Sequence, residues 1–405
     1  MTRISESGWR TRMQAALADA REYTRRCYAH LEAADPVFPL QATVNPARWE
    51  LGHIAWFQEY WCQRHGTAMR PGDPARAERA SRLRGADALY DSSSVPHDTR
   101  WSLPLPDWRG TNRYLDDTLA ATLEAIEHAS EDARDDSRYF FELALLHEDM
   151  HGEALVMTLQ SLGLPPPDGW TPPAESFEAP GGGDVDVPGG TYTIGSRDDE
   201  ARTRFVFDNE LRSHDVALAP FSIARSCVTE GEFAAFVDDG GPLPAYWRRS
   251  GDGYEVRWFD RWRPLAPAHA VQHVSAHQAH AYCAWANRRL PTEVEWEVAA
   301  AREIVGRDAN LDGRHRGPVA AAAGGEGTSH LFGNVWEWTA SAFGPYPGFS
   351  AGPYADYSQP WFGDHHVIRG GSWATRSRLV HARMRNFYRP ERSDMFVGFR
   401  TCAPQ

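Results

Sequence analysis

The chain changes its sequence pattern at a segment rich in proline and glycine, LPPPDGWTPPAESFEAPGGGDVDV, at residues 164–187. This composition is typical of a linker, because proline and glycine interrupt helices and strands. With 405 residues, the chain is also too long for one ordinary hydrophobic core. We therefore expect an α+β protein with two domains, residues 1–163 and 188–405, joined by this linker.

The first domain is predicted to contain four helices. Residues 7–33 have helical periodicity, a second helix lies in NPARWELGHIAWFQEYW at 45–61, a third begins near Thr111, and a fourth runs from about 137 to 163. Four helices of this length are typical of an up-and-down bundle. The connection at about 66–110 is long, and loops of that length are usually functional or mobile.

The second of these helices has an aromatic face. Asn45 is a good N-cap residue and Pro46 suits the first helical position. Residues four apart then fall on the same face. Three of them are aromatic and one is a histidine: Trp49, His53, Phe57 and Trp61. In the residues from 188 onward the pattern is different, with short β-type runs, many Gly and Trp, and one clear helix from Ser275.

Two histidines one helical turn apart occur in the fourth helix, in LLHEDMHGEAL at 145–155. Because residues i and i+4 share a helix face, His147 and His151 can point at one spot, and His53 can join them from the second helix. Three neutral imidazoles would suit Fe(II) that activates oxygen or Zn(II) that activates water. Glu153 lies about 200° around the helix from His151, so we expect it to support the ligands from behind. The alternative is that these histidines are satisfied core residues.

The second half resembles the formylglycine-generating-enzyme (sulfatase-modifying factor) family. Six motifs occur in order: VPGGTYTIGS, CVTEGEFAAF, HVSAHQAHAYCAWANRRLPTEVEWEVAAR, GNVWEWT, RGGSW and VGFR. The resemblance implies a C-type-lectin-like fold, in which Trp336, Trp338 and Trp373 are packing residues. Members with oxidase activity use a cysteine pair just before the final GFR, and residues 369–400 contain no cysteine. That copper chemistry is therefore not expected, and the fold alone does not fix the function.

A DinB-like bundle fused to this second domain resembles the ergothioneine-type sulfoxide synthases. The signature of that group is HxxxHxE in the bundle with one earlier histidine, and here it is matched by His147, His151 and Glu153 with His53 in LGHIAWF. The resemblance implies that the three histidines bind Fe(II) and that O2 is a co-substrate. It further implies that a sulfur or selenium donor is joined to C2 of the imidazole of the histidine betaine hercynine.

Substrate residues are also implied by this resemblance. In the group an RN-aromatic segment contacts the betaine, which carries that role to Asn386 and Phe387, with Tyr388 beside them. Aromatic faces suit a quaternary ammonium, which donates no hydrogen bond. Arg392 and Arg389 are candidate clamps for a donor's carboxylates. The alternative for this segment is a packed final strand.

A tyrosine near the iron acts in the group as a proton or electron donor. The segment FGPYPGFSAGPYADYSQPWF offers Tyr346, Tyr354 and Tyr357, of which we favour Tyr354. The donor is less defined. Tyr388 stands where the γ-glutamylcysteine-using pattern has an acid, which favours the selenium branch, a selenoneine synthase with a neutral selenosugar donor. The alternative is an EgtB-type hercynine sulfoxide synthase that uses cysteine or γ-glutamylcysteine.

The composition limits the expected partners and cellular location. A net charge of −13 argues against a nucleic-acid or anionic-membrane partner, and small molecules are the expected partners. There is no apolar leader or 18-residue apolar run, and five scattered cysteines fit a reducing compartment, so a cytoplasmic location is expected. A DinB-type zinc thiol-transferase or hydrolase and a carbohydrate-binding protein are competing classes. By analogy with the lectin-like fold, a structural Ca²⁺ is a further expectation, with no ligands assigned.

Overall fold

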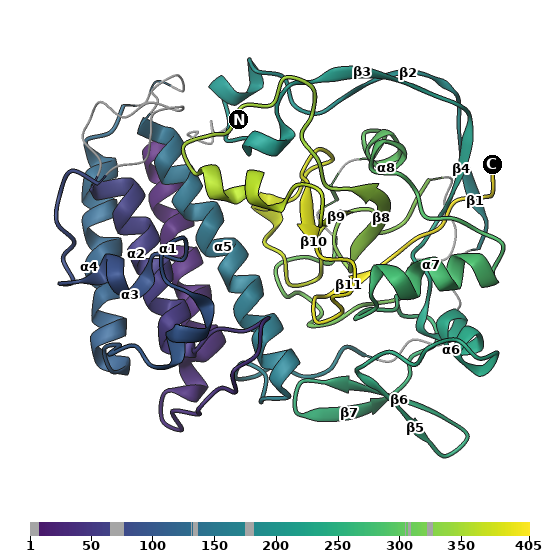
Figure 1. Cartoon of the computed structure of the whole chain (residues 1–405), viewed down its shortest axis with the longest axis horizontal. Coiled ribbons are helices and arrows are strands. Elements are labelled where there is room, and N and C mark those ends of the chain that lie inside the picture. The colour runs from purple at the N-terminus through teal and green to yellow at the C-terminus, as the bar shows by residue number, and fades with distance from the viewer. Residues whose placement is uncertain are drawn as a thin grey trace, which may run out of the picture. The chain divides into compact units, whose positions relative to one another are not determined.

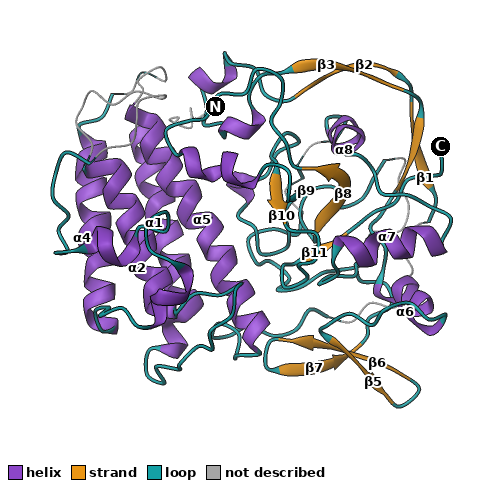
Figure 2. Ribbon diagram, viewed as in Figure 1, coloured by secondary structure: helices purple, strands orange, loops and turns teal. Residues whose placement is uncertain are grey.

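A computed structural model describes residues 8–64, 77–130, 132, 137–174, 182–303, 305–306, 309–321 and 327–405. The chain forms two compact units. The first comprises residues 1–158 with two short segments from later in the chain, 199–205 and 351–357. The second comprises residues 159–198, 206–350 and 358–405. Helices dominate the first unit and small sheets the second, which confirms the α+β prediction (Figure 2).

The first unit is built on four long helices that run side by side (Figure 1). They are α1 (Trp9–Tyr28), α2 (Ala47–Gln63), α4 (Trp108–Glu127) and α5 (Ser137–Leu162). Apolar residues of α1, α4 and α5 form one part of the core, including Leu17, Ile126 and Phe141. The aromatic face of α2 is buried as well, with Trp49 and Phe57 each 1% exposed. The predicted four-helix bundle is therefore confirmed.

Two helix starts differ from the sequence prediction. Helix α2 begins at Ala47, with Pro46 rather than Asn45 at its N-cap, and the Asn45 side-chain oxygen that a cap would use accepts from Arg100 Nη1 at 2.8 Å. The third long helix begins at Trp108 rather than near Thr111, because Asp107 accepts a hydrogen bond from the backbone N–H of Gly110 and so caps the helix three residues earlier.

The long connection between α2 and α4 is partly helical. Among its described residues it contains α3 (Ala86–Tyr90) and the 3-10 helix η2 (His97–Trp101). Tyr90 is fully buried, and its ring lies so close to Gly52 that a side chain at that position would overlap it. The connection is thus packed against α2, on the part of the helix that carries His53.

The described residues of the second unit form four small sheets. The largest has the strand order β10-β9-β8-β11, in which β11 is parallel to β8 and the other pairs are antiparallel. The other sheets pair β1 with β4, β2 with β3, and β5-β6-β7. The strands are β1 (Asp184–Val187), β2 (Gly190–Ile194), β3 (His214–Leu218), β4 (Phe221–Ala224), β5 (Trp247–Ser250), β6 (Gly253–Trp258), β7 (Arg261–Pro264), β8 (Trp336–Ala342), β9 (His366–Arg369), β10 (Asn386–Tyr388) and β11 (Val397–Gly398).

Three short helices accompany these sheets: α6 (Glu230–Asp238), α7 (Ala276–Trp285) and α8 (Glu293–Ala300). Each begins with a capping box, in which a Thr or Ser side chain and a Glu or Gln three residues later satisfy free backbone N–H groups. The tryptophans of the sequence motifs are packing residues, since Trp336, Trp338 and Trp373 are at most 2% exposed. The ion pair of Arg400 with Glu337, both 0% exposed, holds the last motif against β8.

The proline-rich segment between the halves is described only in part. Strand β1 lies within the segment 164–187 interpreted as a linker, and residues 175–181 of that segment lie outside the described residues. The division at 163 and 188 stays a prediction. All five cysteines carry free thiols. Within the described ranges, no helix has the length and apolar character required to cross a membrane.

Candidate metal centre

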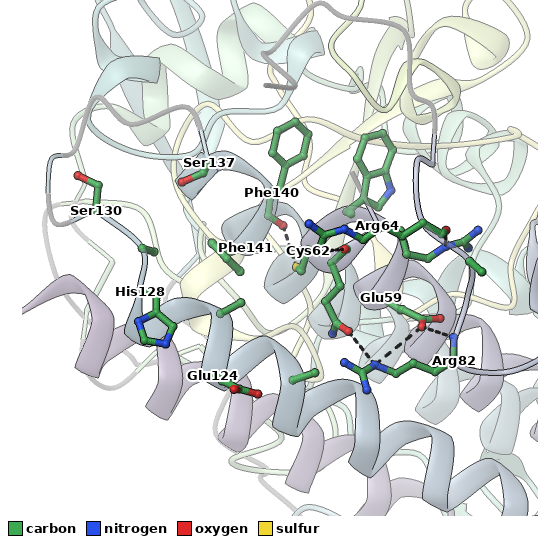
Figure 3. A pocket seen from close by; sticks show the side chains of 17 residues that line it. Glu59, Cys62, Arg64, Arg82, Glu124, His128, Ser130, Ser137, Phe140 and Phe141 are labelled. Carbon is green, nitrogen blue, oxygen red and sulfur yellow. Dashed lines mark hydrogen bonds and ion pairs between the residues drawn. The ribbon is translucent and has the colours of Figure 1, made fainter. Parts of the chain in front are cut away.

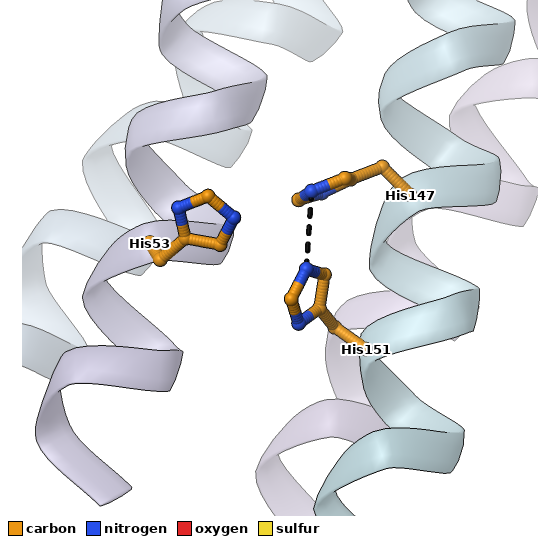
Figure 4. Close-up of side chains that lie close together, drawn as sticks. All are labelled: His53, His147 and His151. Atoms are coloured by element: carbon orange, nitrogen blue, oxygen red, sulfur yellow. Dashed lines mark hydrogen bonds between the residues drawn. The ribbon is translucent and has the colours of Figure 1, made fainter. Parts of the chain in front are cut away.

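Three histidines of the helical unit meet between α2 and α5 (Figure 4). His53 comes from α2, and His147 and His151 come from successive turns of α5. One ring nitrogen from each lies within 4.8 Å of the others, and the Nε2 atoms of His147 and His151 are 3.1 Å apart. Among the described residues this is the one group of three or more metal-binding side chains that converges in this way.

The separation of these nitrogens fits a shared cation. Two imidazole nitrogens that each lie about 2.1 Å from one ion are roughly 3.0–3.4 Å apart, depending on the coordination angle. The 3.1 Å between the Nε2 atoms of His147 and His151 falls in that range. An all-nitrogen donor set of three imidazoles suits Fe(II) or Zn(II) and leaves further coordination positions open.

Two of the three imidazoles are held by a hydrogen bond at Nδ1, which leaves Nε2 for a ligand. His53 Nδ1 lies 2.8 Å from the backbone carbonyl oxygen of Tyr90, and its ring stacks on Trp49 with centroids 5.0 Å apart. His151 Nδ1 lies 2.5 Å from Glu50 Oε1. Such partners on the far nitrogen fix the tautomer and the ring orientation of metal-binding histidines.

His147 is held differently, by packing. Its ring lies flat on Phe57, with centroids 3.4 Å apart and an angle of 4° between the planes. Within the part of the chain that the structure describes, its buried Nδ1 has no hydrogen-bond partner. The orientation of His147 therefore depends on the Phe57 face.

Burial sets the charge state of the cluster. It lowers the pKa of His53 to about 3 and that of His147 well below the usual value, since no water solvates an imidazolium there. Both rings are consequently neutral at pH 7, as metal ligation requires. Burial alone would raise the pKa of Glu50, but attraction to His151 and its hydrogen bond hold that pKa at about 2. Glu50 is therefore a carboxylate at neutral pH and stands directly behind the ring of His151.

The favoured tyrosine of the sequence analysis belongs to the helical unit. Tyr354 lies in the segment 351–357, and its ring contacts Phe57 edge-on at 5.0 Å and His147 at 6.4 Å. Burial raises its pKa above the usual value of 10, so its hydroxyl is protonated at neutral pH. Of the two other candidates, Tyr357 donates to Met150 Sδ at 3.7 Å and Tyr346 lies in the second unit.

The carboxylate on the histidine cluster was missed by the sequence analysis. Glu153 was expected to support the ligands, and it is buried on α5, two residues after His151. The acid that contacts His151 is Glu50, from the opposite helix. A signal was present, because Glu50 precedes His53 by three residues and so shares its helix face. A supporting role for Glu153 stays a prediction.

The residues expected to bind the betaine lie on and after β10 in the second unit. Asn386 Oδ1 accepts a hydrogen bond from the backbone N–H of Phe387, and the Phe387 ring stacks on Phe343 with centroids 3.9 Å apart. Both residues are half-buried. Because the two units are described separately, the substrate role of Asn386 and Phe387 stays a prediction.

The two arginines considered as carboxylate clamps have acidic partners of their own. Arg392 donates to both carboxylate oxygens of Asp394, at 2.9 and 2.6 Å, and its guanidinium lies 4.7 Å from the Tyr388 ring centroid. Arg389 pairs with Asp364 at 3.0 Å. A substrate carboxylate at either position would have to compete with an aspartate.

A cavity of about 700 Å³ lies elsewhere in the helical unit (Figure 3). It is lined by the C-terminal parts of α2 and α4 and the first turns of α5, and by Arg79 and Arg82 of the long connection. Trp61 belongs to its wall and also contacts Tyr354, with ring centroids 6.1 Å apart. The three histidines do not line this cavity.

Comparison with known proteins places both halves of the chain. Residues 172–315 and 318–404 match the family model of the sulfatase-modifying factor enzyme 1-like domain, so the second half belongs to that domain family. A formylglycine-generating enzyme of Thermomonospora curvata is 31% identical over 297 residues, which cover 55% of this chain and 93% of that protein.

Other relatives match nearly the whole chain. The hercynine oxygenase of Mycolicibacterium smegmatis is 32% identical over 428 residues, covering 95% of this chain and 96% of that protein. The hercynine oxygenase of Mycobacterium tuberculosis is 33% identical over 426 residues with the same coverage. These alignments include the helical unit with its histidines as well as the sulfatase-modifying factor domain. The chain therefore belongs to the hercynine oxygenase family of O2-dependent oxidative enzymes.

Proposed function

We propose that this protein binds iron through His53, His147 and His151 and uses O2 to join a chalcogen donor to C2 of the hercynine imidazole. The observation that carries the proposal is the near full-length similarity to relatives named hercynine oxygenase. The convergence of three imidazole nitrogens within 4.8 Å supports it independently. The donor in our primary proposal is a thiol, cysteine or γ-glutamylcysteine, as in the EgtB-type enzymes named above.

The histidines would hold the metal through neutral nitrogens, and the low pKa values of His53 and His147 prepare two of them for this. An Fe(II) ion held by these residues would supply O2 activation and would stabilise the donor as a thiolate, since a metal lowers the pKa of a bound thiol.

Tyr354 is proposed to hold a proton at its phenolic oxygen beside the cluster. Its raised pKa keeps that proton in place at neutral pH, and its ring is fixed by edge-on contacts with Phe57 and Trp61. A tyrosine that is both protonated and rigid can hold a proton at a fixed position beside the histidines and donate it there.

The betaine of hercynine is proposed to contact Asn386 and Phe387, because a quaternary ammonium is held by aromatic faces rather than by hydrogen bonds. Tyr388, with Arg392 over its ring, borders the same strand. These assignments rest on the RN-aromatic motif of the family resemblance.

A selenosugar donor, which would make the protein a selenoneine synthase, is the second candidate. One observation favours it: Arg392 and Arg389 are each paired with an aspartate, so the carboxylates of an amino-acid donor would have to displace an aspartate at either residue. A selenosugar has no carboxylates and would not require them.

The test is a donor competition. Protein loaded anaerobically with Fe(II) is mixed with hercynine and with cysteine, γ-glutamylcysteine or a selenosugar, and then exposed to O2. We expect mass spectrometry to detect a C2 adduct of hercynine with a thiol donor, and no adduct in His147→Ala. An adduct with the selenosugar alone would establish the second candidate, and unconsumed hercynine with every donor would refute both.

Metal content separates this proposal from the zinc alternatives. A protein purified with zinc, whose activity is indifferent to O2, would be a DinB-type thiol-transferase or hydrolase. A protein that binds a carbohydrate equally well as wild type and as His147→Ala would be a lectin. A structural Ca²⁺ in the second unit stays a separate proposal, which calcium analysis of the dialysed protein tests.

A further inference from the structure

The carboxylate of Glu50 ends a chain of hydrogen bonds that begins at the guanidinium of Arg100. Arg100 donates through Nη1 to Asn45 Oδ1 at 2.8 Å, Asn45 donates through Nδ2 to Glu50 Oε2 at 2.6 Å, and Glu50 Oε1 lies 2.5 Å from His151 Nδ1. Arg100 and Glu50 are only 8% and 6% exposed. Water therefore has little access to the two ends of the chain.

The direction of each hydrogen bond in this chain follows from which groups can only donate and which can only accept. A guanidinium can only donate, so the Asn45 atom that faces Arg100 must be the carbonyl oxygen. The amide nitrogen of Asn45 then faces Glu50, where it can only donate. Glu50 accepts from Asn45 on one oxygen, and its other oxygen, as a carboxylate, can only accept from His151.

We propose that Glu50, held in place by Asn45 and Arg100, fixes His151 as the tautomer that carries its proton on Nδ1 and presents a free Nε2 lone pair to the metal. Arg100 and Asn45 are positioning residues in this scheme, and Glu50 acts on the ligand directly. The inference rests on the metal site proposed above and adds to it which ring nitrogen of His151 carries the proton. A carboxylate on a ligand imidazole also raises its basicity and strengthens the metal bond.

The same arginine reaches the second ligand by another route. Its guanidinium lies 3.8 Å from the Trp49 ring centroid, and Trp49 stacks on His53 at 5.0 Å. Arg100 is itself held by backbone carbonyls of the long connection, at Ser92 and Val95. The connection that the sequence analysis judged functional or mobile thus supplies the anchor for two of the three imidazoles.

The scheme makes an unusual prediction for Glu50→Gln. Asn45 still needs an acceptor, so the glutamine would turn its oxygen to Asn45 and its NH2 group to His151. His151 would then have to accept at Nδ1 and carry its proton on Nε2, where a proton blocks ligation. A nearly isosteric substitution should therefore weaken metal binding about 10- to 100-fold, the range for loss of such a partner.

A second substitution should restore the acceptor at His151 Nδ1. In Asn45→Asp/Glu50→Gln, the new aspartate accepts from Arg100 and from the glutamine NH2, so the glutamine oxygen faces His151 again. The double variant has the same net charge as wild type. We expect it to regain much of the lost affinity, about tenfold or more, because the acceptor at Nδ1 is restored.

The experiment measures the Co(II) dissociation constant by chelator competition, together with the visible spectrum of bound Co(II), for folded wild type, Glu50→Gln and the double variant. Glu59→Gln is the matched control, since Glu59 is another buried carboxylate of α2 that bonds Tyr114 and Ser81 away from the histidines. It should leave the constant unchanged even if it costs stability.

The outcomes separate the two proposals. If wild type does not bind Co(II), the metal site is refuted and the inference with it. If wild type binds and Glu50→Gln binds equally well, or the double variant binds no better than Glu50→Gln, only the scheme for the His151 tautomer fails. Should Glu50→Gln not fold, ¹⁵N shifts of the Zn(II)-loaded wild type decide, because a proton on Nε2 of His151 would overturn the scheme.

Discussion

A buried ion pair holds the four long helices together, and its acid, Glu148, directly follows His147 in the chain. Arg21 of α1 donates through Nε and Nη2 to the two carboxylate oxygens of Glu148 on α5, at 2.7 and 3.0 Å. It also donates to Gln58 Oε1 on α2 and to the carbonyl of Leu115 on α4. Arg21 is 2% exposed and Glu148 1%. One side chain therefore contacts all three other helices of the bundle.

The substitution Arg21→Met tests this arrangement. It leaves the Glu148 carboxylate buried with Thr24 Oγ1 as its remaining side-chain donor, and an uncompensated buried charge costs about 3–5 kcal/mol. With a urea m-value of about 2–3 kcal/mol/M, the unfolding midpoint should fall by roughly 1–2.5 M. Far-UV circular dichroism is the appropriate probe, since the four long helices contain most of the described helical residues.

Two further variants decide whether the reasoning is right. Arg25→Met removes the next arginine of α1, whose partner Asp116 is exposed, and should cost under about 1 kcal/mol. Arg21→Met/Glu148→Leu removes both charges, and the exchange of a buried pair for apolar residues is often about neutral. The account is refuted if Arg21→Met costs no more than Arg25→Met, or if the double variant is less stable than Arg21→Met.

Three other predictions concern single residues. Phe57→Ala should cost about 3–5 kcal/mol of stability. Because the Phe57 ring orients His147, the substitution should also weaken Co(II) binding by the folded protein. An unchanged Co(II) affinity in chelator competition would contradict this. Tyr354→Phe should retain metal affinity but form less product for each O2 consumed. An oxygen electrode and mass spectrometry measure the two amounts, and an unchanged ratio of product to O2 would exclude a role for the hydroxyl. Burial lowers the pKa of His273 from 6.5 to about 4. Between these two pH values the unfolded chain therefore binds a proton at His273 that the folded protein does not. Stability should fall there by up to about 1.4 kcal/mol per pH unit as the pH drops. His273→Asn should reduce this slope in urea titrations at several pH values, since Asn tolerates the positive φ of 62° and can still donate to Ser393.

The sequence predicted the parts of the site that depend on local periodicity. The i,i+4 spacing of His147 and His151 and the aromatic repeat of α2 placed the imidazoles on facing helices, because a helix fixes which residues share a face. The partners of those imidazoles depend on contacts between distant segments, such as Glu50 with His151 and Tyr90 with His53. Helix periodicity carries no information about such pairs.

The two misplaced helix starts have a related cause. Asn45 has the side chain of an N-cap residue, but its side-chain oxygen accepts from Arg100, 55 residues away, so a tertiary contact overrides the local preference. For α4 the local signal was available, since Asp107 is a strong cap, and the prediction began the helix too late. Tyr354 belongs to the same unit as the histidines and Tyr346 to the other unit, and the catalytic role of Tyr354 stays a prediction.

The path of the chain limits how this protein can be divided. Because residues 199–205 and 351–357 belong to the helical unit, the backbone passes between the two units five times, after residues 158, 198, 205, 350 and 357. A fragment that ends at the proline-rich segment would lack Tyr354 and expose the faces of Phe57 and Trp61 that it covers. A recombinant or chimaeric form of the helical unit must therefore carry residues 351–357 to keep the aromatic residues around the histidines covered.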